Sequence, residues 1–567
     1  MYIARIPNRS SPPAYLLRES YRQQGKVKNR TLANLSHLPI RQIELLRRVL
    51  QGETLVRPEE ALAIEGSRPH GHVEAVLGML RKLGIESLLG SKRSRQRDLV
   101  LAMIVQRVLF PCSKLATTRA WQSSTLAEEL HVGDADADEL YAALDWLLAR
   151  QASIEQKLAA RHLGEGSLVL YDVSSSCYEG RTCCLARHGH SRDGKKGRPI
   201  IVYGLLSDGR GRPVAVEVYA GNTGDPTTLP EQVQKLRGRF GLTRVVLAGD
   251  RRLLTQTQIQ TLRQYPGLGW ISALRSEAIR ELLAAGHLQR SLFDQLHLAE
   301  IRSPDFPGER LVACFNPLLA DQRARRREEL LLATQQELAR LARQVAGRTK
   351  KPLKKEEIAL KAGRVINRFK VAKDFQLSIE DGVFAWQRNA SSIGRESQLD
   401  GIYVIRTSQP QEELAADDAV REYKRLGDVE RAFRCLKSIE LRVRPIYHHV
   451  DDRVRAHILL CTLAYYVEWH LKQAWAPLLF QEQDLPALRA QRDPVAAAEP
   501  SARVQRKKAT RQTPQGLPVQ SFTTLLRHLA TRCRNTCRLA TDPAAATFHL
   551  LTQPTPLQAE AFRLLRL

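Results

Sequence analysis

The sequence predicts an α/β protein, and residues 166–275 carry most of that prediction. Short apolar runs come first in this stretch, and helical and apolar segments then alternate, which is typical of a mixed sheet covered by helices. Two of the apolar runs end on a carboxylate, at Asp172 and Asp250. In open α/β sheets, reactive groups commonly lie at strand ends. We therefore expect acidic side chains at one edge of the sheet, in a chain of 567 residues that is long enough for several domains.

Residues 1–165 are expected to form an N-terminal region of short strands followed by helices. Residues 1–6 and 14–21 are extended runs divided by a Pro/Ser-rich turn, and residues 24–31 have the pattern of a basic hairpin. From about His70 to His162, apolar residues recur at three- and four-residue spacing, which predicts helices. A helical packing layer is the plainest role for them.

Residues 166–275 are expected to form the first part of a central core. The predicted strands are 167–173, 199–206, 213–219, 244–248 and 269–274, and residues 227–240 are a predicted helix.

Residues 276–414 are expected to form an inserted domain, because the stretch from Asp250 to Glu430 is far too long for a single loop. It contains a basic segment that continues as a helix to Val345, and then a lysine-rich turn. Residues 375–379 and 383–387 read as a hairpin around Asp381-Gly382. A charge run is most often a solvated face, but in a DNA-binding protein it would contact phosphates.

Residues 415–480 are expected to be the second part of the core, and residues 481–567 a basic linker with C-terminal helices. Residues 417–437 read as a helix whose weak point is Gly427. A largely apolar helix is predicted over 453–471, a flexible linker over 490–515, and short helices over 522–529 and 544–551.

One face of the helix predicted over 417–437 has an unusual composition. Tyr423, Glu430 and Lys437 recur seven residues apart, so they return close to the same face every two turns and span roughly 21 Å. Taken alone, the motif is as well explained by a solvated amphipathic helix. Together with Asp172 and Asp250, however, Glu430 completes a set of three carboxylates, and Mg²⁺ and Mn²⁺ prefer such hard oxygen ligands.

Around these residues the chain resembles the DDE transposases of bacterial insertion sequences, in the branch with a Tyr-Arg-Glu-Lys helix and a large insertion. The matching motifs occur in the same order as in that family. They are Tyr171-Asp-Val-Ser-Ser-Ser-Cys-Tyr-Glu-Gly180, Gly189-His-Ser-Arg-Asp193, residues 201–209 and 213–222, Arg444-Pro-Ile-Tyr-His-His and residues 454–466.

The resemblance implies a ribonuclease H-like mixed sheet interrupted by an inserted domain. It also implies that Asp172, Asp250 and Glu430 are the catalytic residues and hold two Mg²⁺ or Mn²⁺ ions. Tyr423 and Lys437 would position phosphates. The N-terminal region would recognise element ends, and the chain would act as a homodimer on double-stranded DNA.

Two positions depart from the family pattern. Leu426 stands where the helix motif has an arginine, so Arg425 or Arg434 would have to supply that DNA contact. Arg252 stands where a glycine usually follows the second aspartate, and a glycine there would permit a backbone angle that arginine tolerates poorly. Trp386 is a further candidate for binding DNA, since related transposases stack an extruded base on an aromatic residue of the inserted domain. A tryptophan that fills the hairpin's own core is the more usual case.

Composition agrees with a nucleic-acid partner. There are 87 lysines and arginines against 60 acidic residues, a formal net charge of +27, which attracts a polyanion. An anionic membrane surface would also attract such a chain. Because no apolar stretch reaches the ~18–20 residues of a spanning helix, and residues 18–30 are polar, we expect a protein of the bacterial cytoplasm associated with the nucleoid.

The nine cysteines indicate free thiols in a reducing compartment, because their number is odd. Cys177, Cys183, Cys184, His188 and His190 are close in sequence, but they lack the paired spacing of a structural zinc site, so a metal there is not favoured. Cys533 and Cys537, four residues apart, are expected to share a helix face as packed thiols.

The function that the sequence favours is that of a DNA transposase, which cleaves the ends of a mobile element and joins them to target DNA. A ribonuclease H-like endonuclease would use the same three carboxylates without joining strands. A non-catalytic DNA-binding protein derived from a transposase ranks last, because all three carboxylates are present.

Overall fold

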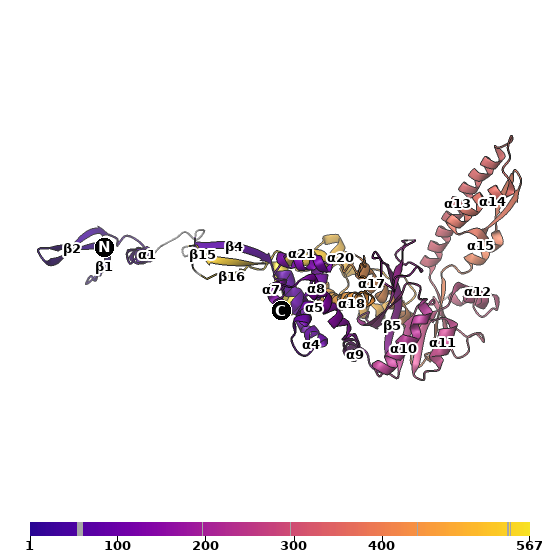
Figure 1. Cartoon of the computed structure of the whole chain (residues 1–567), viewed down its shortest axis with the longest axis horizontal. Helices are drawn as coiled ribbons and strands as arrows, with labels where there is room; N and C mark the ends of the chain where they lie inside the picture. Colours follow the sequence, from indigo (N-terminus) through magenta and orange to yellow (C-terminus); the bar gives the residue numbers. More distant parts are fainter. Residues whose placement is uncertain (54–60, 196, 295, 439, 541–543, 545) are drawn as a thin grey trace. The chain divides into compact units, whose positions relative to one another are not determined.

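The structure is a computed structural model that describes residues 1–53, 61–195, 197–294, 296–438, 440–540, 544 and 546–567. Its contacts divide the chain into two compact units. The first joins Met1–Arg68 to Cys533–Gln553, and the second joins Pro69–Arg532 to Pro554–Leu567. The second unit therefore contains all three of the carboxylates singled out above. The elements of both units are labelled in Figure 1.

The first unit contains two three-stranded sheets. One consists of β1 (Tyr2–Ile6), β2 (Ala14–Gln23) and β3 (Lys26–Asn34), with helix α1 (Ile40–Leu50) packed against β1. The other consists of β4 (Leu62–Pro69), β15 (Cys533–Leu539) and β16 (Phe548–Leu551). The expected basic hairpin is confirmed as β2 and β3. It turns at Gln24-Gly25, both at positive φ (54° and 77°), a geometry that matches the twist of paired strands.

Two predictions near the C-terminus are wrong. Cys533 and Cys537 lie on strand β15 and not on a helix, and Phe548–Leu551 forms strand β16 where a helix was expected. Residues four positions apart share a face in a helix and also in a strand, so their spacing alone could not separate the two. Pairing between β15 and β16 decides in favour of the strands.

The second unit is organised around an eight-stranded mixed sheet in the order β10-β11-β14-β9-β8-β5-β6-β7. β8 is parallel to β5 and to β9, whereas the other neighbouring strands are antiparallel. Three consecutive antiparallel strands (β5, β6, β7) followed by two parallel ones (β8, β9) make the expected ribonuclease H-like arrangement. The strands are β5 (Ser167–Cys177), β6 (Ile200–Asp208), β7 (Pro213–Ala220), β8 (Val245–Gly249), β9 (Leu268–Ala273), β10 (Leu298–Ile301), β11 (Arg310–Phe315) and β14 (Ile402–Thr407).

Strand β5 is longer than the apolar run predicted. It continues through the three serines to Cys177, because these residues keep pairing with β6 as far as Cys177↔Ile200. Asp172 therefore lies within the strand and not at its end, which corrects the prediction. Asp250 does follow directly after β8, as expected.

Helices cover the sheet and carry the third carboxylate. α17 (Leu426–Lys437) packs on β5, and the long buried α18 (Asp451–Ala474) packs on β7. The helix predicted over 417–437 is two helices, since α16 (Ala416–Lys424) ends at Arg425. Gly427, the predicted weak point, lies just after that break. The predicted helix over 227–240 is η2 (Asp225–Thr228), α10 (Leu229–Gln234) and η3 (Lys235–Arg239).

The helical layer expected before the core is present, and α18 packs against two of its members, α5 and α8 (Figure 1). The layer comprises α3 (Gly71–Lys82), α4 (Ile85–Leu89), α5 (Arg95–Leu109), α6 (Lys114–Ala120), η1 (Trp121–Ser123), α7 (Leu126–Leu130), α8 (Ala137–Leu148) and α9 (Gln151–His162). Two further helices, α11 (Gln256–Arg263) and α12 (Ser276–Ala284), pack on β9 and β14 respectively.

Residues 276–414 contribute to the central sheet through β10, β11 and β14, and they also form a separate cluster. In that cluster α13 (Pro317–Ala346) and α14 (Lys355–Phe369) pack together and against the hairpin of β12 (Phe375–Glu380) and β13 (Val383–Arg388). α15 (Ala390–Ser397) follows the hairpin. The predicted hairpin around Asp381-Gly382 is confirmed.

The stretch predicted as a flexible linker contains helical structure, which corrects the prediction. α20 (Ala502–Thr510) forms there, capped by Ser501, and α19 (Leu485–Gln491) ends at the start of the stretch. Lys507 is buried and donates to the carbonyls of Ala476 (2.8 Å) and Leu479 (2.9 Å), so α20 is fastened to the end of the core. The predicted helix over 522–529 is α21 (Phe522–Ala530), and the chain ends with α22 (Pro556–Leu565).

Among the described residues, no single helix is long and apolar enough to cross a membrane. One pair, Arg95–Leu109 with Lys114–Ser123, meets the criterion together by length and composition but is bent by 86°.

Candidate active site

Two neighbouring parallel strands bring the aspartates together. Tyr171 in β5 pairs with Gly249 in β8, so the next residues along, Asp172 within β5 and Asp250 directly after β8, lie at the same level of the sheet. The Asp172 carboxylate accepts the N–H of Val173 at 2.8 Å, and the Asp250 carboxylate accepts the N–H of Arg252 at 2.5 Å. The register of the sheet thus explains why two acids 78 positions apart become neighbours.

Helix α17 supplies the third carboxylate. Val429, Ala432 and Phe433 are buried, and the Phe433 ring lies 5.7 Å from the ring of Tyr203 in β6, so this face of the helix rests on the sheet. Glu430 lies at the border of that face and is exposed. The charges of Asp250 and Glu430 both act on Asp172, so both carboxylates lie near it. We call Asp172, Asp250 and Glu430 the acid site.

The surroundings of the Asp172 carboxyl favour its neutral form. Burial raises the pKa of Asp172 to about 7. The charges of Asp250 and Glu430 raise the pKa further, whereas the Val173 N–H and the Arg192 guanidinium lower it. Burial and then the charge of Asp250 raise the pKa of the Tyr423 hydroxyl to about 12. That hydroxyl keeps its proton at neutral pH and can donate a hydrogen bond to a phosphate.

The donor set of the acid site fits divalent metal ions. Three carboxylates provide hard oxygen ligands, and like charges in a common space are stable only when cations neutralise them. Among the described residues, only Cys435, Glu440 and Glu468 bring three ligand atoms within 4.8 Å of one another. The oxygens of the acid site are therefore spread more widely, as mutual repulsion between carboxylates would cause.

The cluster of Cys435, Glu440 and Glu468 already holds a cation of its own. Lys472 Nζ lies 2.6 Å from the Glu468 carboxylate and 3.0 Å from that of Glu440. The Cys435 thiol donates to Glu468 at 3.0 Å. An ammonium thus takes the place that a metal ion would need.

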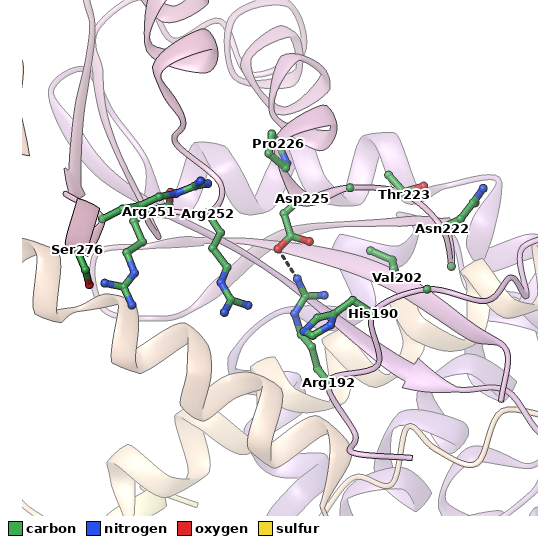
Figure 2. Close-up of a pocket in the computed structure, with 14 residues that line it drawn as sticks. His190, Arg192, Val202, Asn222, Thr223, Asp225, Pro226, Arg251, Arg252 and Ser276 are labelled. Carbon is green, nitrogen blue, oxygen red and sulfur yellow. Dashed lines mark hydrogen bonds and ion pairs between the residues drawn. The ribbon is translucent and has the colours of Figure 1, made fainter. Parts of the chain in front are cut away.

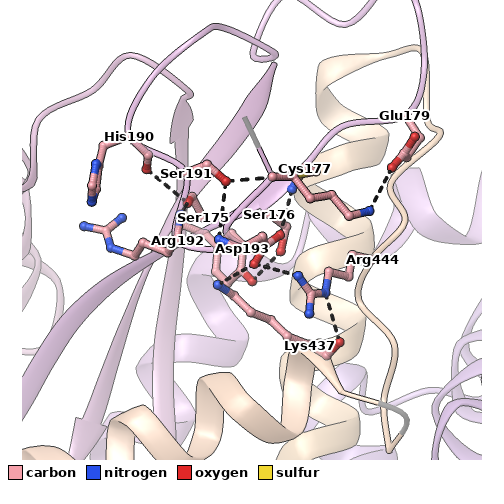
Figure 3. Close-up of polar contacts among 12 residues, drawn as sticks. Ser175, Ser176, Cys177, Glu179, His190, Ser191, Arg192, Asp193, Lys437 and Arg444 are labelled. Carbon is pink, nitrogen blue, oxygen red and sulfur yellow. Dashed lines mark hydrogen bonds and ion pairs between the residues drawn. The ribbon is translucent and has the colours of Figure 1, made fainter. Parts of the chain in front are cut away.

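The end of α17 is held by an ion-pair network centred on Asp193 (Figure 3). The Asp193 carboxylate lies 3.2 Å from Lys437 Nζ and 2.8 Å from the Arg444 guanidinium, and it accepts the N–H of Cys177 at 3.0 Å. Burial works to raise the pKa of Asp193, but Lys437, the Cys177 N–H and Arg444 hold it below its ordinary value. The Asp193 side chain is only 2% exposed, so this network fixes where α17 ends relative to β5.

A basic cleft of about 700 Å³ adjoins the acid site. Its arginines are Arg192, Arg251, Arg252 and Arg275, and two of them directly follow Asp250. Figure 2 shows Arg251 and Arg252 to one side of the cleft and Arg192, paired with Asp225, to the other. This arrangement suits a phosphate backbone passing beside the carboxylates.

The residues expected to contact DNA lie in different surroundings. Tyr423 is half-buried beside the acid site, and Lys437 is engaged with Asp193. Arg425 donates to the Gly209 carbonyl at 3.2 Å and pairs with Glu422 at 3.1 Å. Arg434 is exposed and lines a second open cavity, of about 670 Å³. Their roles in DNA binding stay predictions.

The structure corrects two expectations about the family departures. Leu426 is only 8% exposed and packs in the main core, so it does not leave an apolar spot on a DNA-facing surface. Arg252 is not among the described residues with positive φ, so the backbone there accepts an arginine without strain.

Trp386 lies away from the tip of its hairpin. It pairs with Leu377 in β12, and its ring lies 6.0 Å from that of Phe375, within the core shared with α13 and α14. The ring is half-buried. This position favours packing, and its stacking with a base stays a prediction.

The cysteines of the disfavoured zinc motif serve other contacts. All nine cysteines are free. The Cys183 thiol donates to Asp451 at 3.0 Å, and the Cys184 N–H donates to the same carboxylate at 2.8 Å. These contacts fasten the segment after β5 to the start of α18.

The fold and two family models identify the family to which the chain belongs. The sheet order and the acid site define a ribonuclease H-like protein. A family model described as "Transposase DDE domain" matches residues 181–467, and one described as "IS1634 family transposase, N-terminal domain" matches residues 3–62. The chain therefore belongs to the DDE transposases of insertion sequences, and DNA is its partner. The first match covers Asp250 and Glu430 and begins after Asp172.

The other comparisons add little. No curated protein matches the chain. The chain is similar to a piggyBac transposase solved by cryo-EM in a synaptic complex with hairpin DNA, with a TM-score of 0.35 and 11% identity over 81% of this chain and 76% of that one. A likeness this low says nothing about the chemistry of this chain.

Several residues of the site were not singled out by sequence reasoning. Arg192, Asp193 and Arg444 lie inside the motifs that carry the resemblance, but their pairing depends on contacts between β5, the loop after it and α17. The signal available was the charge within Gly189-His-Ser-Arg-Asp193, which no spacing rule connects to Lys437. Arg251 and Arg252 were seen only as a departure from the family, and the cleft shows what they line.

Proposed function

We propose that the chain cleaves DNA at the ends of a mobile element and joins those ends to target DNA, with Asp172, Asp250 and Glu430 as the catalytic metal ligands. The observation that supports this most is that Asp172 and Asp250 lie on neighbouring strands of a ribonuclease H-like sheet, with the charges of Asp250 and Glu430 both acting on Asp172. Two Mg²⁺ or Mn²⁺ ions bound there would supply Lewis acidity to the attacking and the leaving oxygen.

The chain's own residues would bind and orient the DNA backbone. Arg251, Arg252 and Arg275 line one cleft beside the acid site, and their guanidinium groups suit phosphates. The Tyr423 hydroxyl, which stays protonated, would donate to a phosphate oxygen next to the carboxylates. Such contacts fix the register of the DNA without reading its sequence.

A single assay separates this proposal from its alternatives. Purified protein is incubated with labelled element ends and a target plasmid, with and without Mg²⁺. Metal-dependent nicking followed by joined products supports transposition. Nicking without joining supports an endonuclease, and binding without nicking supports a non-catalytic DNA-binding protein.

We also propose that two copies act together on the DNA, one at each element end. Light scattering coupled to gel filtration, with and without end DNA, measures this directly. A complex that contains one copy per DNA end and never two ends would contradict the dimer.

The proposed base-stacking role of Trp386 can be separated from packing. Since its half-buried ring contacts Phe375 in the hairpin core, Trp386→Ala should lower Tm and slow every step alike, at a stability cost below the ~3–5 kcal/mol of a fully buried tryptophan. Phe384→Ala in the same core is a matched control. If Trp386→Ala instead slowed second-strand cleavage more than first-strand nicking, and left Tm unchanged, stacking on an extruded base would be the better explanation.

A further inference from the structure

A second pocket in the same unit has the opposite charge to the acid site. It has a volume of about 500 Å³ and lies between the end of α5, the start of α6, residues 442–450 and the start of α18. Its cationic residues are Arg107, Lys114, Arg442, Arg444 and Arg453, and three histidines line it as well. Of the described residues that line it, none is acidic. We call it the cationic pocket.

Lys114 is the least compensated charge in this pocket. Lys114 is only 4% exposed. Within the described part of the chain, its ammonium has neither a carboxylate partner nor a hydrogen-bond acceptor. Arg107 is 6% exposed and donates to backbone carbonyls alone, including that of Cys112 at 3.1 Å. Two buried cations side by side without a counter-ion destabilise a fold unless something else supplies the negative charge.

Carboxylates that contact the pocket's arginines or lie at the start of α18 are already engaged. Asp145 pairs with Arg453 at 3.5 Å, and Asp193 pairs with Arg444 at 2.8 Å. Asp451 accepts the N–H of Cys184 and the thiol of Cys183. Each of these acids faces a partner of its own, so none of them neutralises Lys114.

The positive field of the pocket shows in its other titratable groups. Burial, followed by the repulsion from Arg107, lowers the pKa of Lys114 to about 7. Burial and then the charges of Lys114, Arg107 and Arg453 lower the pKa of His448 to about 3. An anion bound among these groups would relieve the repulsion and raise both values.

We propose that the cationic pocket binds a phosphate group. Arginine and lysine side chains that converge on one cavity are the usual partners of phosphate, and a cavity of about 500 Å³ has room for the phosphate with part of the molecule that carries it. That molecule is either DNA, through a backbone phosphate, or a free phosphate. The DNA source rests on the proposed function, whereas the free source does not.

Position favours a link with the acid site. Arg444 lines the cationic pocket and also reaches Asp193 and the carbonyl of Lys437, at 3.2 Å, at the end of α17 (Figure 3). A phosphate held in the pocket would therefore lie next to the network that fixes the helix carrying Glu430.

The first test uses inorganic phosphate and the full-length protein. Isothermal titration should show binding to the wild type, with proton uptake near pH 7 because Lys114 becomes charged as the anion binds. Lys114→Gln and Arg442→Gln should each weaken this binding roughly ten- to a hundredfold, the usual effect of losing a charge-assisted contact. Arg119→Gln is the matched control, since Arg119 is an exposed cation on α6 outside the pocket.

Melting temperatures distinguish phosphate binding by Lys114 from a purely structural role of this residue. Without phosphate, Lys114→Gln should raise Tm at neutral pH, because it removes an unpaired buried charge. Added phosphate should raise the Tm of the wild type and leave that of Lys114→Gln unchanged. A Tm that falls in Lys114→Gln and still rises with phosphate would overturn the proposal.

The second test identifies the source of the phosphate. If it belongs to DNA, Lys114→Gln should weaken end-binding for all sequences and reduce the salt dependence of binding by about one unit of slope, and inorganic phosphate should compete with DNA. If it is free, phosphate binding is lost while DNA binding stays at the wild-type level. The proposal fails if the wild type binds no inorganic phosphate and Lys114→Gln binds DNA normally, or if Arg119→Gln has the same effects as Lys114→Gln. Neither outcome depends on cleavage, so failure of the catalytic proposal would be seen separately.

Discussion

The acid site and the cationic pocket are opposites within one unit of the protein. In the first, three carboxylates lie near one another, and burial raises the pKa of Asp172 to about 7. In the second, Lys114 and several arginines share a space that no described carboxylate lines, and the pKa of Lys114 is lowered to about 7. Folding tolerates such charge where a ligand of the opposite sign completes the site.

Other buried charges in the same unit are neutralised within the protein. Glu155, only 1% exposed, lies 3.3 Å from Lys235 and 2.9 Å from Arg239, and it accepts the N–H of Val216. Burial alone therefore does not mark a ligand site. Among the described residues, Asp172 in the acid site and Lys114 in the cationic pocket have no ion-pair partner, whereas Glu155 has two.

The largest effect is expected at the acid site. Asp172→Ala, Asp250→Ala and Glu430→Ala should each reduce cleavage of element ends by roughly a thousandfold or more, and the triple variant should be no worse than a single one. Binding of DNA should persist, because metal ligands contribute little to phosphate contacts. Gel assays of nicking and of mobility measure the two properties side by side.

Glu277→Ala, an exposed carboxylate on α12, is the control for this series. Near wild-type nicking by any one of the three alanine variants would remove that residue from the site.

The next largest effect concerns a charge cluster that is compensated internally. Asp193→Asn should lower stability, by less than the ~3–5 kcal/mol of a fully buried pair, because it leaves the mostly buried Lys437 and the half-buried Arg444 without their shared carboxylate. Thermal and urea unfolding measure the loss. Lys437→Gln tests the same network from the other side and should also lower Tm. If Lys437→Gln weakened DNA binding without changing Tm, Lys437 would be a phosphate contact as its helix spacing predicts.

Charges in the acid site and in the cationic pocket should change the stability of the fold with pH in opposite directions. The pKa of Asp172 is about 7 in the folded chain and near 3.8 when unfolded, so its charging destabilises the fold as pH rises through about 4 to 7. Without divalent ions, Asp172→Asn should therefore have a higher Tm than the wild type at about pH 8, by roughly 2–4 °C, and an equal Tm at about pH 4.

The pKa of Lys114 moves the other way, from 10.5 to about 7, so its charge destabilises the fold fully below pH 7 and not above about 10.5. Lys114→Gln should accordingly raise Tm at about pH 6 and lose that advantage in alkali. Melting curves for both variants across pH give the result. Parallel rather than opposite trends would mean that the two sites are not of opposite charge.

Local pattern was enough to predict much of this site, and non-local contacts explain what it missed. The apolar runs before Asp172 and Asp250 predicted strands, because buried strands have a strong local signature. That these strands are neighbours comes from their pairing. The heptad spacing predicted the helix face of Glu430, but it could not include the break at Arg425 between α16 and α17 or the burial of Leu426.

The cationic pocket could not be predicted at all. Arg107 and Lys114 come from the helical layer, whereas Arg442 and Arg453 are more than 300 positions later, and nothing in either segment signals the other. The place of β15 beside β4 could not be predicted for the same reason, since these two strands are separated by most of the chain. Charge clusters and sheets assembled from distant segments are properties of the fold.

The smallest expected effect concerns which arginine contacts DNA, since Leu426 itself is buried. Arg434 is exposed, and within the described residues its guanidinium has no ion-pair partner, whereas Arg425 is tied to Glu422 and to the Gly209 carbonyl. Arg434→Gln should therefore reduce the salt dependence of end-binding by about one unit of slope and leave Tm unchanged. Arg425→Gln should do the reverse, lowering Tm slightly without changing the slope. Fluorescence anisotropy over a salt series, with a melting curve for each variant, gives both quantities. A changed slope in Arg425→Gln alone would place the DNA on the side of α16 and α17 where Arg425 lies, and Arg434 would then be a solvated surface charge of the kind whose removal has little effect.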